Sequence, residues 1–381
     1  MKKMNSIRDI PSFENVRIMV RASLNVEVEN GVVLNTFRLR KALPTIQFLQ
    51  SKGARVILIG HISDTGTETL EPVFKELSKT IKHIAWCPVH KGGEAKKMIE
   101  EMEASSVLVL ENLRRDKGEV SNDEDFAAAV AGLADIFVQD SFDVCHRPHA
   151  SVVGIPKLLP SYAGFLVEDE IKELSRALKP KRPALAIIGG AKFTTKEPVL
   201  KKLLSVYDKV FVGGALANDF IQALGHGVGT SLTSHPDPEA VHALLQNKKL
   251  SLPTDAVVAP IQAQATEGHV SSLTEIPADQ AILDGGPATS RHLRRLVSGA
   301  KTILWNGPLG NYEHGFVTGS EDLAEAIAES KAVSILGGGD TVALVEKANL
   351  GSQYTFISTG GGAMLDFIAN GTLPGIDALR R

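Results

Sequence analysis

The feature that most restricts the fold of this chain is a glycine-rich segment that follows a short apolar run, Val333–Leu344, with the sequence V-S-I-L-G-G-G-D-T-V-A-L. Its apolar, partly β-branched start predicts a buried strand, and the residues after Asp340 have a helical pattern. A strand, a turn without side chains and a helix N-terminus bring free backbone N–H groups and the positive end of the helix dipole together, which favours a bound anion. Taken alone, the segment is equally typical of an ordinary turn in which Asp340 caps the helix.

Further segments in the second half of the chain have the same order of an apolar run followed by glycine. They begin at Ile187, Phe211, Leu304 and Ile357. The carboxyl ends of the strands form the ligand crevice of an open parallel α/β sheet, so this recurrence favours a phosphate site over simple turns. Asp340 beside a phosphate is typical of a shared divalent cation. Lys192 and Lys196 would share one face of a helix and hold phosphates, unless one of them is an ordinary solvated lysine.

The first half of the chain also alternates apolar runs with helical patterns, which predicts a second parallel α/β sheet. At or just past the ends of its predicted strands, cationic side chains stand in place of glycine. They are Arg21, Arg38, His61, Arg114 and Arg147. Each arginine alone is more typical of a solvated surface. Their recurrence at strand ends favours a pocket for a small anion, because the guanidinium fork suits carboxylate and phosphate oxygens.

The length of the chain and one long helical pattern predict two domains. A chain of 381 residues is too long for one compact core. Residues 164–178 have the pattern of an amphipathic helix, which K-P-K-R-P at residues 179–183 ends. We therefore expect a first domain over residues 1–163, an interdomain helix over 164–180 and a second domain over 181–365, although a plain surface helix would show the same pattern. The tail, 366–381, is expected to pack back on the first domain.

Charge, cysteine content and missing motifs exclude several classes of protein. The net charge is −3 and no basic tract carries interleaved aromatic residues, so we expect no nucleic-acid partner. The two cysteines, Cys87 and Cys145, form neither a disulfide framework nor a zinc motif, which fits a reducing cytoplasm. No apolar run spans a bilayer and Met1–Glu14 lacks the core of a signal peptide, so we expect a cytoplasmic protein that binds no membrane. Its expected partners are small molecules, and we expect a monomer. The P-loop, Rossmann and protein-kinase motifs are missing.

With these residues identified, the chain resembles the phosphoglycerate kinase family along nearly its whole length. The resemblance is carried by R-A-S-L-N from Arg21, F-R-L-R-K-A-L-P-T-I from Phe37, L-E-N-L-R from Leu110, H-R-P-H-A-S from His146, G-G-A-K from Gly189, W-N-G-P-L-G from Trp305, G-G-G-D-T from Gly337, S-T-G-G-G-A from Ser358 and L-P-G-I-D-A-L from Leu373. It implies an α/β fold of two Rossmann-like lobes, each a parallel sheet flanked by helices, joined by a hinge helix that closes the lobes. It also implies a glycolytic, reversible, magnesium-dependent phosphoryl transfer between 1,3-bisphosphoglycerate with ADP and 3-phosphoglycerate with ATP.

The same resemblance assigns roles to individual residues. Arg38 and Lys192 would be catalytic, and Asp340 would bind Mg²⁺. The first lobe would bind 3-phosphoglycerate through Ser23, Asn25, Arg38, His61, Arg114 and Arg147. The second lobe would bind ATP or ADP through Gly190, Lys192, Lys196, Gly214, Asn306, Pro308, Glu313, Gly338, Gly339, Asp340, Thr341, Gly361 and Gly362.

The sequence departs from the family's pattern mainly in the predicted substrate site. Ser23 stands where the family has aspartate, Asp64 where it has arginine, Asp143 where small residues are usual and Thr195 where it has aspartate, and a usual lysine is missing near Ala288. An acid in place of a cation removes an attraction for an anionic substrate and adds a repulsion. Two alternatives to the kinase therefore remain, a non-catalytic nucleotide-binding paralogue and a kinase for a different small acid. The missing fingerprint disfavours a nicotinamide oxidoreductase.

Overall fold

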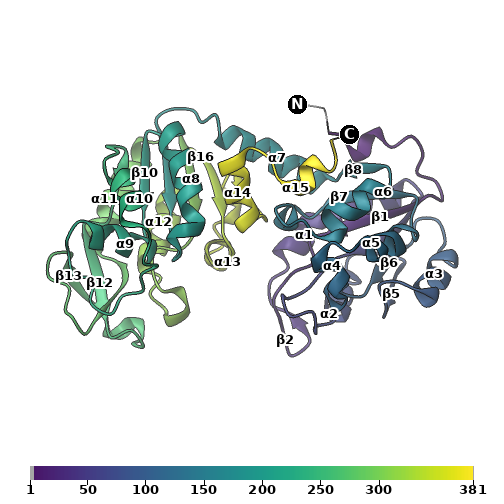
Figure 1. The fold of residues 1–381 in the computed structure, drawn as a ribbon, viewed down its shortest axis with the longest axis horizontal. Coiled ribbons are helices and arrows are strands. Elements are labelled where there is room, and N and C mark those ends of the chain that lie inside the picture. Colours follow the sequence, from purple (N-terminus) through teal and green to yellow (C-terminus); the bar gives the residue numbers. More distant parts are fainter. Residues whose placement is uncertain (1–3, 381) are drawn as a thin grey trace. The chain divides into compact units, whose positions relative to one another are not determined.

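The computed structural model describes residues 4–380 as an α/β protein with two separate parallel sheets (Figure 1). Contacts divide the chain into unit 1, formed by Met1–Lys172 with Thr372–Arg381, and unit 2, formed by Glu173–Gly371. Each unit contains one six-stranded sheet with helices packed against it. The predicted α/β fold of two parallel sheets flanked by helices is confirmed.

Unit 1 is built on a sheet with the strand order β5-β6-β4-β1-β7-β8. All neighbouring strands are parallel, and Val20 in β1 pairs with Leu58 on one side and Val138 on the other. Because β1 is central and covered on both faces, its middle residues, Ile18–Val20, are apolar and buried. The strands are β1 (Arg17–Ala22), β4 (Arg55–Ile59), β5 (Ile84–Cys87), β6 (Val107–Leu110), β7 (Ile136–Asp140) and β8 (Ser161–Ala163). A two-stranded hairpin, β2 (Val28–Glu29) and β3 (Val32–Val33), lies outside this sheet.

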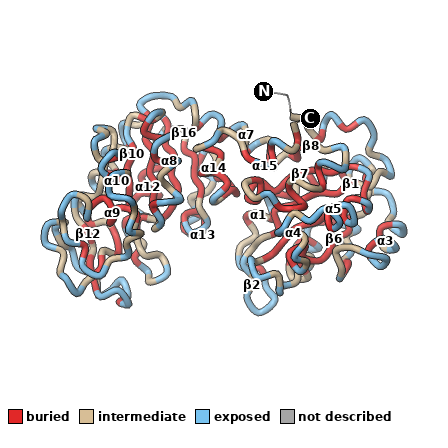
Figure 2. The backbone as a smooth tube through the Cα atoms, viewed as in Figure 1, coloured by how far each residue is buried: buried red, intermediate tan, exposed pale blue. Residues whose placement is uncertain are grey.

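Helices cover both faces of this sheet, and each face has its own core. Val20 and Leu58 pack with Ile46 of α1 in one core, whereas Met19 and Ile57, on the opposite face, pack in the other. Figure 2 shows the buried strands at the centre of the unit. The helices are α1 (Phe37–Ser51), α2 (Glu71–Leu77), α3 (Gly93–Glu100), α4 (Lys117–Ser121), α5 (Glu124–Ala131), α6 (Ile155–Leu158) and α15 (Pro374–Asp377). Shorter helical turns are η1 (Ile7–Asp9), η2 (Leu113–Arg115), η3 (Phe142–Val144) and η4 (Ala150–Gly154).

The long helix α7 (Phe165–Ala177) begins in unit 1 and ends in unit 2, because the division between the units falls after Lys172. The start of α7 is fixed by Asp140 at the end of β7, whose Oδ1 accepts a hydrogen bond from Leu166 N at 2.9 Å. A side chain at Gly164 would meet this carboxylate, since its Cβ would lie 2.1 Å from Asp140 Oδ1. The glycine therefore allows the chain to pass close to the acid that holds the helix.

The C-terminal segment returns to unit 1, with Gly375 N donating a hydrogen bond to Cys145 O at 2.9 Å. The predicted returning tail began at residue 366. The structure keeps residues 366–371 in unit 2, because α14 (Gly362–Asn370) continues to Asn370 and packs on α8.

Unit 2 is built on a second parallel sheet, with the strand order β11-β10-β9-β15-β16-β17. Each glycine-rich segment found in the sequence follows a strand of this one sheet, so the prediction that they are strand ends is confirmed. Because the strands are parallel, these ends meet at one edge. The strands are β9 (Ala184–Ile188), β10 (Lys209–Val212), β11 (Leu250–Ser251), β15 (Thr302–Asn306), β16 (Val333–Gly337) and β17 (Phe356–Ile357). The helices are α8 (Phe193–Val206), α9 (Leu216–Ala223), α10 (Pro238–Leu245), α11 (Pro287–Gly299), α12 (Thr318–Glu329), α13 (Gly339–Lys347) and α14, with short turns η5 (Ala265–Glu267), η6 (Tyr312–His314) and η7 (Gly351–Gln353).

A separate antiparallel sheet in unit 2 was not predicted. Its strands are β12 (Asp255–Ala259), β13 (His269–Ser272) and β14 (Ala281–Gly285), in the order β13-β12-β14. The sequence predicted strands at 256–259 and 282–284 but not their pairing, because a short apolar run does not record which strand it will pair with.

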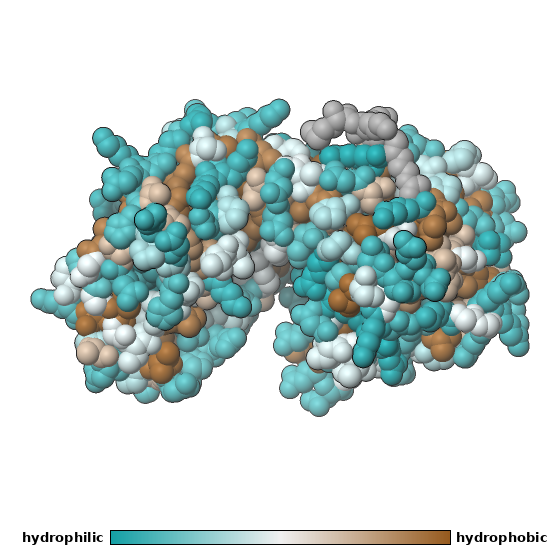
Figure 3. Space-filling view, in the orientation of Figure 1, coloured by the Kyte–Doolittle hydropathy of each residue, from teal (hydrophilic) through white to brown (hydrophobic). Residues whose placement is uncertain are grey.

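The visible face of both units carries mostly hydrophilic residues (Figure 3). The large apolar side chains that are exposed are Val32, Leu34, Val120, Leu158, Leu224, Leu232, Ile261 and Val270. Within residues 4–380, none of the helices combines the length and apolar character that a bilayer span requires.

Candidate functional site

A buried arginine and a buried histidine lie at the carboxyl ends of β1 and β4 in unit 1. Arg21 is 1% exposed, and its Nη2 lies 2.8 Å from Nδ1 of His61. Its Nε donates a hydrogen bond to Ser151 Oγ at 3.0 Å. A guanidinium can only donate, so His61 Nδ1 accepts and the ring proton of the neutral imidazole is on Nε2.

Four arginines of unit 1 act on this imidazole. The pKa of His61 is lowered well below its usual value, first by burial and then by the positive charges of Arg21, Arg114, Arg147 and Arg38. The fold therefore brings together the arginines that the sequence predicted for an anion. His149 lies in the same field, and burial followed by Arg114, Arg147 and Arg21 lowers its pKa to about 4.

Arg114 is also buried and held by the fold. Its side chain is 3% exposed, and its Nη1 donates a hydrogen bond to Ser63 O at 2.7 Å. Asn112 fixes the turn that carries it, since Asn112 Oδ1 accepts from Arg114 N at 3.1 Å and Asn112 Nδ2 donates to Ile62 O at 3.0 Å. Arg114 Nη2 is buried and has no hydrogen-bond partner among the described residues. A buried guanidinium with an unused donor is typical of a site that receives an anion.

Arg38 and Asn25 are tied to the same loop. Arg38 lies in the first turn of α1, and its Nη1 donates to the backbone oxygen of Asn25 at 2.6 Å. The side-chain oxygen of Asn25 accepts from Ser63 N at 2.9 Å. Asn25 thus connects the start of α1 to the loop after β4, which also contains Asp64.

Asp64, one of the departures from the family's pattern, pairs with two of the arginines. Its Oδ1 accepts a short hydrogen bond from Arg114 Nη1 and lies 3.3 Å from Arg147 Nη1. The hydrogen bond from Arg114 is the main reason that the pKa of Asp64 is lowered. The Asp64 side chain is nevertheless 79% exposed.

Two other departures from the pattern are bonded to each other. Ser23 is fully buried, and its Oγ donates to Asp143 Oδ1 at 2.9 Å. Ser141 Oγ donates to the same oxygen at 2.6 Å. Burial lowers the pKa of Arg21, and the negative charges of Glu119 and Asp143 oppose this shift. The hydroxyl of Ser23 therefore holds a neighbouring carboxylate instead of facing solvent.

In unit 2, most of the predicted nucleotide-binding residues line one pocket at the carboxyl edge of the parallel sheet. The members of this set that line it are Gly190, Lys196, Asn306, Pro308, Gly338, Gly339, Asp340, Thr341, Gly361 and Gly362, and Gly307 and Leu365 complete the lining. We call it the phosphate pocket. Both α13 and α14 begin here, so their unpaired N-terminal N–H groups lie at the pocket.

Two glycines of the phosphate pocket are required by the backbone. Gly338, the N-cap of α13, has φ +98°, and Gly361, the N-cap of α14, has φ +52°. Both values lie in the left-handed region that favours glycine. Thr341 is buried and its Oγ1 accepts from Gly307 N at 3.1 Å, so this side chain fixes the loop after β15 against α13.

The predicted lysines differ in their surroundings. Lys196 is partly buried, and burial lowers its pKa while the charge of Asp366 opposes the shift. Asp366, which was not predicted from the sequence, lies on α14. Lys192, the N-cap of α8, is exposed and is not among the residues that line the phosphate pocket. Glu313 in η6 is also exposed and is also not among the residues that line the phosphate pocket.

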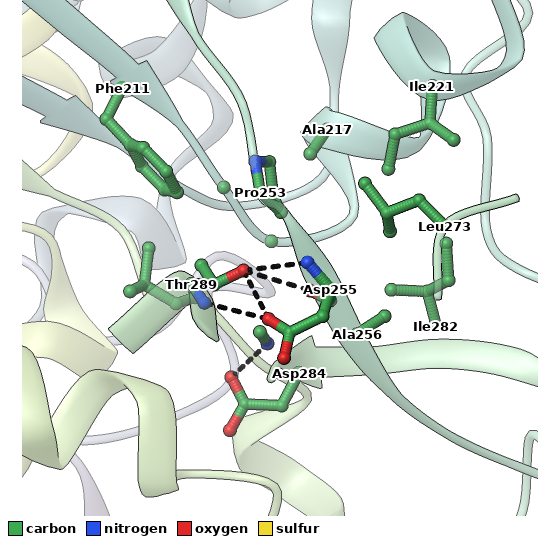
Figure 4. A pocket seen from close by; sticks show the side chains of 14 residues that line it. Phe211, Ala217, Ile221, Pro253, Asp255, Ala256, Leu273, Ile282, Asp284 and Thr289 are labelled. Carbon is green, nitrogen blue, oxygen red and sulfur yellow. Dashed lines mark hydrogen bonds between the residues drawn. The ribbon is translucent and has the colours of Figure 1, made fainter. Parts of the chain in front are cut away.

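A second, narrow pocket of unit 2 was missed in the sequence (Figure 4). We call it the apolar pocket. Its lining is Phe211, Gly213, Gly214, Ala217, Ile221, Pro253, Asp255, Ala256, Leu273, Ile282, Asp284, Gly285, Thr289 and Leu309. It neighbours the phosphate pocket across Gly214, where a Cβ would lie 2.9 Å from both Gly190 N and Pro308 O. The only sequence signal for it was the glycine pair after β10, since its apolar walls come from distant segments.

The polar side of the apolar pocket contains two carboxylates that hold backbone and side-chain donors. Asp255 Oδ1 accepts from Thr289 Oγ1 at 2.8 Å and from Thr289 N at 2.8 Å (Figure 4). Asp284 accepts from Gly285 N at 2.8 Å and from Gly319 N at 2.9 Å. Burial raises the pKa of Asp284 to about 7, although these two hydrogen bonds oppose the shift.

We expect Asp284 to make unit 2 less stable as the pH rises. The folded protein keeps the proton up to about pH 7, whereas the unfolded chain loses it near the ordinary aspartate pKa of 3.8, so the free energy of unfolding falls between these values. The fall is roughly 4 kcal/mol, because one pKa unit corresponds to about 1.4 kcal/mol. Urea unfolding at several pH values, followed by the fluorescence of buried Trp305 in a Trp86→Phe background, measures it.

Asp284→Asn should flatten this pH dependence, although the lost hydrogen bond lowers stability by a constant amount at every pH. An unchanged slope in the variant would show that another group is responsible.

The residues present fit a magnesium ion only together with a ligand. Within residues 4–380, no three or more histidine, cysteine, aspartate or glutamate side chains are grouped to hold a metal. Asp340 is the one carboxylate among the residues that line the phosphate pocket. Magnesium is commonly bound by one or two carboxylates with phosphate oxygens and water, so one carboxylate beside a phosphate site is a suitable partial set.

Comparisons with known proteins agree along nearly the whole chain. The sequence model of a family described as phosphoglycerate kinase matches residues 7–371. The chain is 38% identical over 389 residues to a phosphoglycerate kinase of Thermomicrobium roseum, covering 99% of each chain. It is 40% identical over 388 residues to one of Rubrobacter xylanophilus, covering 98% of this chain and 97% of that protein.

The solved structures that resemble this chain include phosphoglycerate kinases as well. The structure of phosphoglycerate kinase from Coxiella burnetii is similar with a TM-score of 0.83 and 35% identity, covering 99% of both chains. The crystal structure of phosphoglycerate kinase from Pyrococcus horikoshii is similar with a TM-score of 0.89 and 29% identity, covering 99% of this chain and 98% of that one.

Proposed function

The chain belongs to the phosphoglycerate kinase family, and from this premise we propose that unit 1 binds 3-phosphoglycerate, unit 2 binds ATP or ADP, and a phosphoryl group passes reversibly between them. The reaction is the glycolytic transfer between 1,3-bisphosphoglycerate with ADP and 3-phosphoglycerate with ATP. The observation that carries the division of roles is that four arginines converge on His61 in unit 1, while predicted phosphate ligands line one pocket in unit 2.

In unit 2, the proposal places the phosphates of the nucleotide in the phosphate pocket and its base in the neighbouring apolar pocket. The N-termini of α13 and α14 and the ammonium of Lys196 supply positive charge to the phosphates. Lys192, which is exposed at the start of α8, is assigned to the transferring phosphoryl group, and Glu313 to the ribose. The faces of the aromatic base would pack against apolar walls such as Ile221 and Ile282.

Asp340 is proposed to bind a magnesium ion together with the nucleotide. Mg²⁺ bound by Asp340 and the nucleotide would neutralise phosphate charge as it develops. Without the metal, this exposed carboxylate would repel the phosphates that the pocket is proposed to hold.

Chemically, a carboxylate oxygen of 3-phosphoglycerate attacks the γ-phosphorus of ATP, and the bond to the β-phosphate oxygen breaks with its electrons going to ADP. No proton is transferred, so positioning and positive charge are what the protein must supply. Arg38 and Lys192 are proposed to stabilise the transferring group from the two sides. A neutral His61 can donate a hydrogen bond through Nε2 without itself changing charge.

The two groups of residues belong to different units, so the transfer requires their substrates to be brought together. We propose that residues 1–163 act as the acceptor domain and 181–365 as the nucleotide domain. The segment 164–180, which contains α7, is proposed as the hinge.

Ser23 was predicted to bind 3-phosphoglycerate, and we now propose that Asp143 has this role instead. The family's pattern has an aspartate at position 23, and the structure has a serine there that holds the carboxylate of Asp143. The carboxylate has thus moved to another segment, and the two departures compensate each other. Asp143→Ser should therefore raise the KM for 3-phosphoglycerate by about tenfold, the usual scale of one charged hydrogen bond.

A double-mutant cycle checks this reassignment. Ser23→Asp alone would place two carboxylates side by side, whereas Ser23→Asp with Asp143→Ser restores one carboxylate and should recover most of the KM. Additive losses in the cycle would contradict the compensation.

The function itself is tested by measuring ADP formation from MgATP with and without 3-phosphoglycerate, with calorimetry of ADP binding on the same sample. Turnover that depends on 3-phosphoglycerate is the expected result. ADP binding without turnover would point to a non-catalytic paralogue, and turnover only with another small acid would point to a changed acceptor.

We also propose a cytoplasmic monomer that acts on small molecules, without nucleic acid or membrane. Both cysteines are buried free thiols, which is usual in a reducing compartment. Sedimentation of the purified chain would test the monomeric state.

A further inference from the structure

The arginine cluster of unit 1 holds an anion of its own, the carboxylate of Asp64. We propose that Asp64 is an internal competitor for the acceptor substrate: it occupies Arg114 and Arg147 when the site is empty, and the anionic group of the acceptor binds after displacing it. The inference rests on the proposed function in that it concerns the same acceptor site. In this proposal Asp64 does not bind the substrate. It affects specificity by competing with the substrate for Arg114 and Arg147.

The two sides of this ion pair are held very differently. Arg114 is 3% exposed and is fixed through Ser63 O and the turn capped by Asn112. Asp64 is 79% exposed and lies in an irregular loop after β4. The carboxylate can therefore leave without uncovering a core, whereas the guanidinium stays where an incoming anion would meet it.

Asp64 also bridges two cations that are far apart in the sequence. Its Oδ1 accepts from Arg114 Nη1 and lies 3.3 Å from Arg147 Nη1, so one oxygen is shared between them. Two guanidinium groups converging on one oxygen form the arrangement that suits a phosphate or carboxylate oxygen. The internal carboxylate thus sits at a position that a substrate oxygen would take.

The guanidinium of Arg114 has capacity for a better partner than Asp64. Its Nη2 is buried and unpartnered among the described residues, although Nη1 is bonded twice. The carboxylate of Asp64, on an exposed surface loop, leaves this donor unused. A phosphate group, with three acceptor oxygens, could use it together with Arg147, and this gives the incoming ligand its advantage over Asp64.

The other acids near the cluster are already engaged elsewhere. Asp143 accepts from Ser23 and Ser141, and Glu119 accepts from Ser151 Oγ at 2.5 Å. Asp64 is therefore the acid that faces Arg114 and Arg147. The Asp64 carboxylate is 79% exposed, so water can take over its hydrogen bonds when it leaves, and we expect its charge to affect ligand affinity more than stability.

Because Asp64 carries a single negative charge, the charge of a ligand affects how readily the ligand displaces it. A dianionic phosphate displaces one carboxylate more readily than another monoanion does, since both compete for the same two cations. We therefore expect Asp64 to increase the preference of the site for phosphorylated over unphosphorylated small acids.

The test compares Asp64→Asn with the wild-type protein. Asparagine keeps the size of the side chain but removes the charge. We expect the KM for 3-phosphoglycerate and the dissociation constant of inorganic phosphate to fall roughly three- to tenfold, and the dissociation constant of ADP to stay the same. Asp125→Asn, which removes one charge from an exposed position on α5 of the same unit, is the matched control and should change neither constant.

Phosphate affinity by calorimetry separates this inference from the proposed function, because it needs no turnover. If the wild-type protein fails to turn over but Asp64→Asn still binds phosphate more tightly, the assigned reaction fails and the competitor stands. Unchanged phosphate affinity in Asp64→Asn would overturn the competitor. Weaker phosphate binding would also overturn it, because Asp64 would then support the ligand. An equal gain in Asp125→Asn would reduce the effect to net charge and overturn it as well.

Discussion

Replacing Arg38 by alanine is expected to lower kcat for phosphoryl transfer by about 10²- to 10³-fold and to leave the dissociation constant of MgADP unchanged. Removing one positioned donor from a transition state typically has an effect of this size. Arg38 lies in unit 1, where its Nη1 bonds to Asn25 O at 2.6 Å, and the proposed nucleotide ligands lie in unit 2. Steady-state kinetics and calorimetry with the same preparation measure the two quantities.

Arg40 provides a matched control for this prediction. It lies two residues further along α1, is exposed, and its Nη1 donates to Thr36 Oγ1 at 2.9 Å. Arg40→Ala removes the same charge from the same helix and should change kcat little. Arg38→Lys should recover only part of the rate, since an ammonium keeps the charge but lacks the planar fork. If Arg38→Ala weakened ADP binding as much as it slowed transfer, the division of roles between the units would be wrong.

Asp340→Asn is expected to have opposite effects with and without magnesium. With magnesium, the affinity for ATP should fall by at least tenfold and kcat should fall with it, because the metal loses a charged ligand. In the presence of a chelator, the affinity for free ADP should stay the same or increase. The reason is that Asp340 then no longer repels the phosphates.

The change of sign makes this prediction specific. A variant that merely disturbed the start of α13 would lose affinity under both conditions. Asp279→Asn, at an exposed position of the same unit, tests whether net charge alone matters and should be neutral under both. Equal loss of affinity in Asp340→Asn with and without the metal would remove Asp340 from the metal site.

The phosphate pocket could be predicted from the sequence because its parts are local. A strand, a glycine turn and a helix N-terminus are adjacent in the chain, as at Gly338 and Gly361, and the strand-end rule brings separate turns to one edge of a parallel sheet. The same rule predicted that cations after the strands of unit 1 would converge, but Arg38 was placed wrongly, since it lies in the first turn of α1 and follows no strand of the parallel sheet. Lys192 and Glu313 could be named but not placed, since both are exposed and outside the pocket lining.

The apolar pocket could not be predicted, because no local pattern records it. Ile221 comes from α9, Leu273 follows β13 and Ile282 lies in β14, and these segments meet only through the antiparallel sheet. Likewise, the raised pKa of Asp284 is caused by burial of its side chain, and the residues next to it in the sequence do not predict that burial.

The sequence by itself determined the two parallel sheets, the glycine turns of the phosphate pocket and the set of cations in unit 1, because hydrophobic periodicity and glycine act over a few neighbouring residues. Only the tertiary structure decided what the unusual acids do. Ser23 and Asp143 form one hydrogen-bonded pair, and Asp64 is held by Arg114 and Arg147. The reason is that the free energy of a charge depends on the groups within a few ångströms of it, and these come from segments that are far apart in the chain.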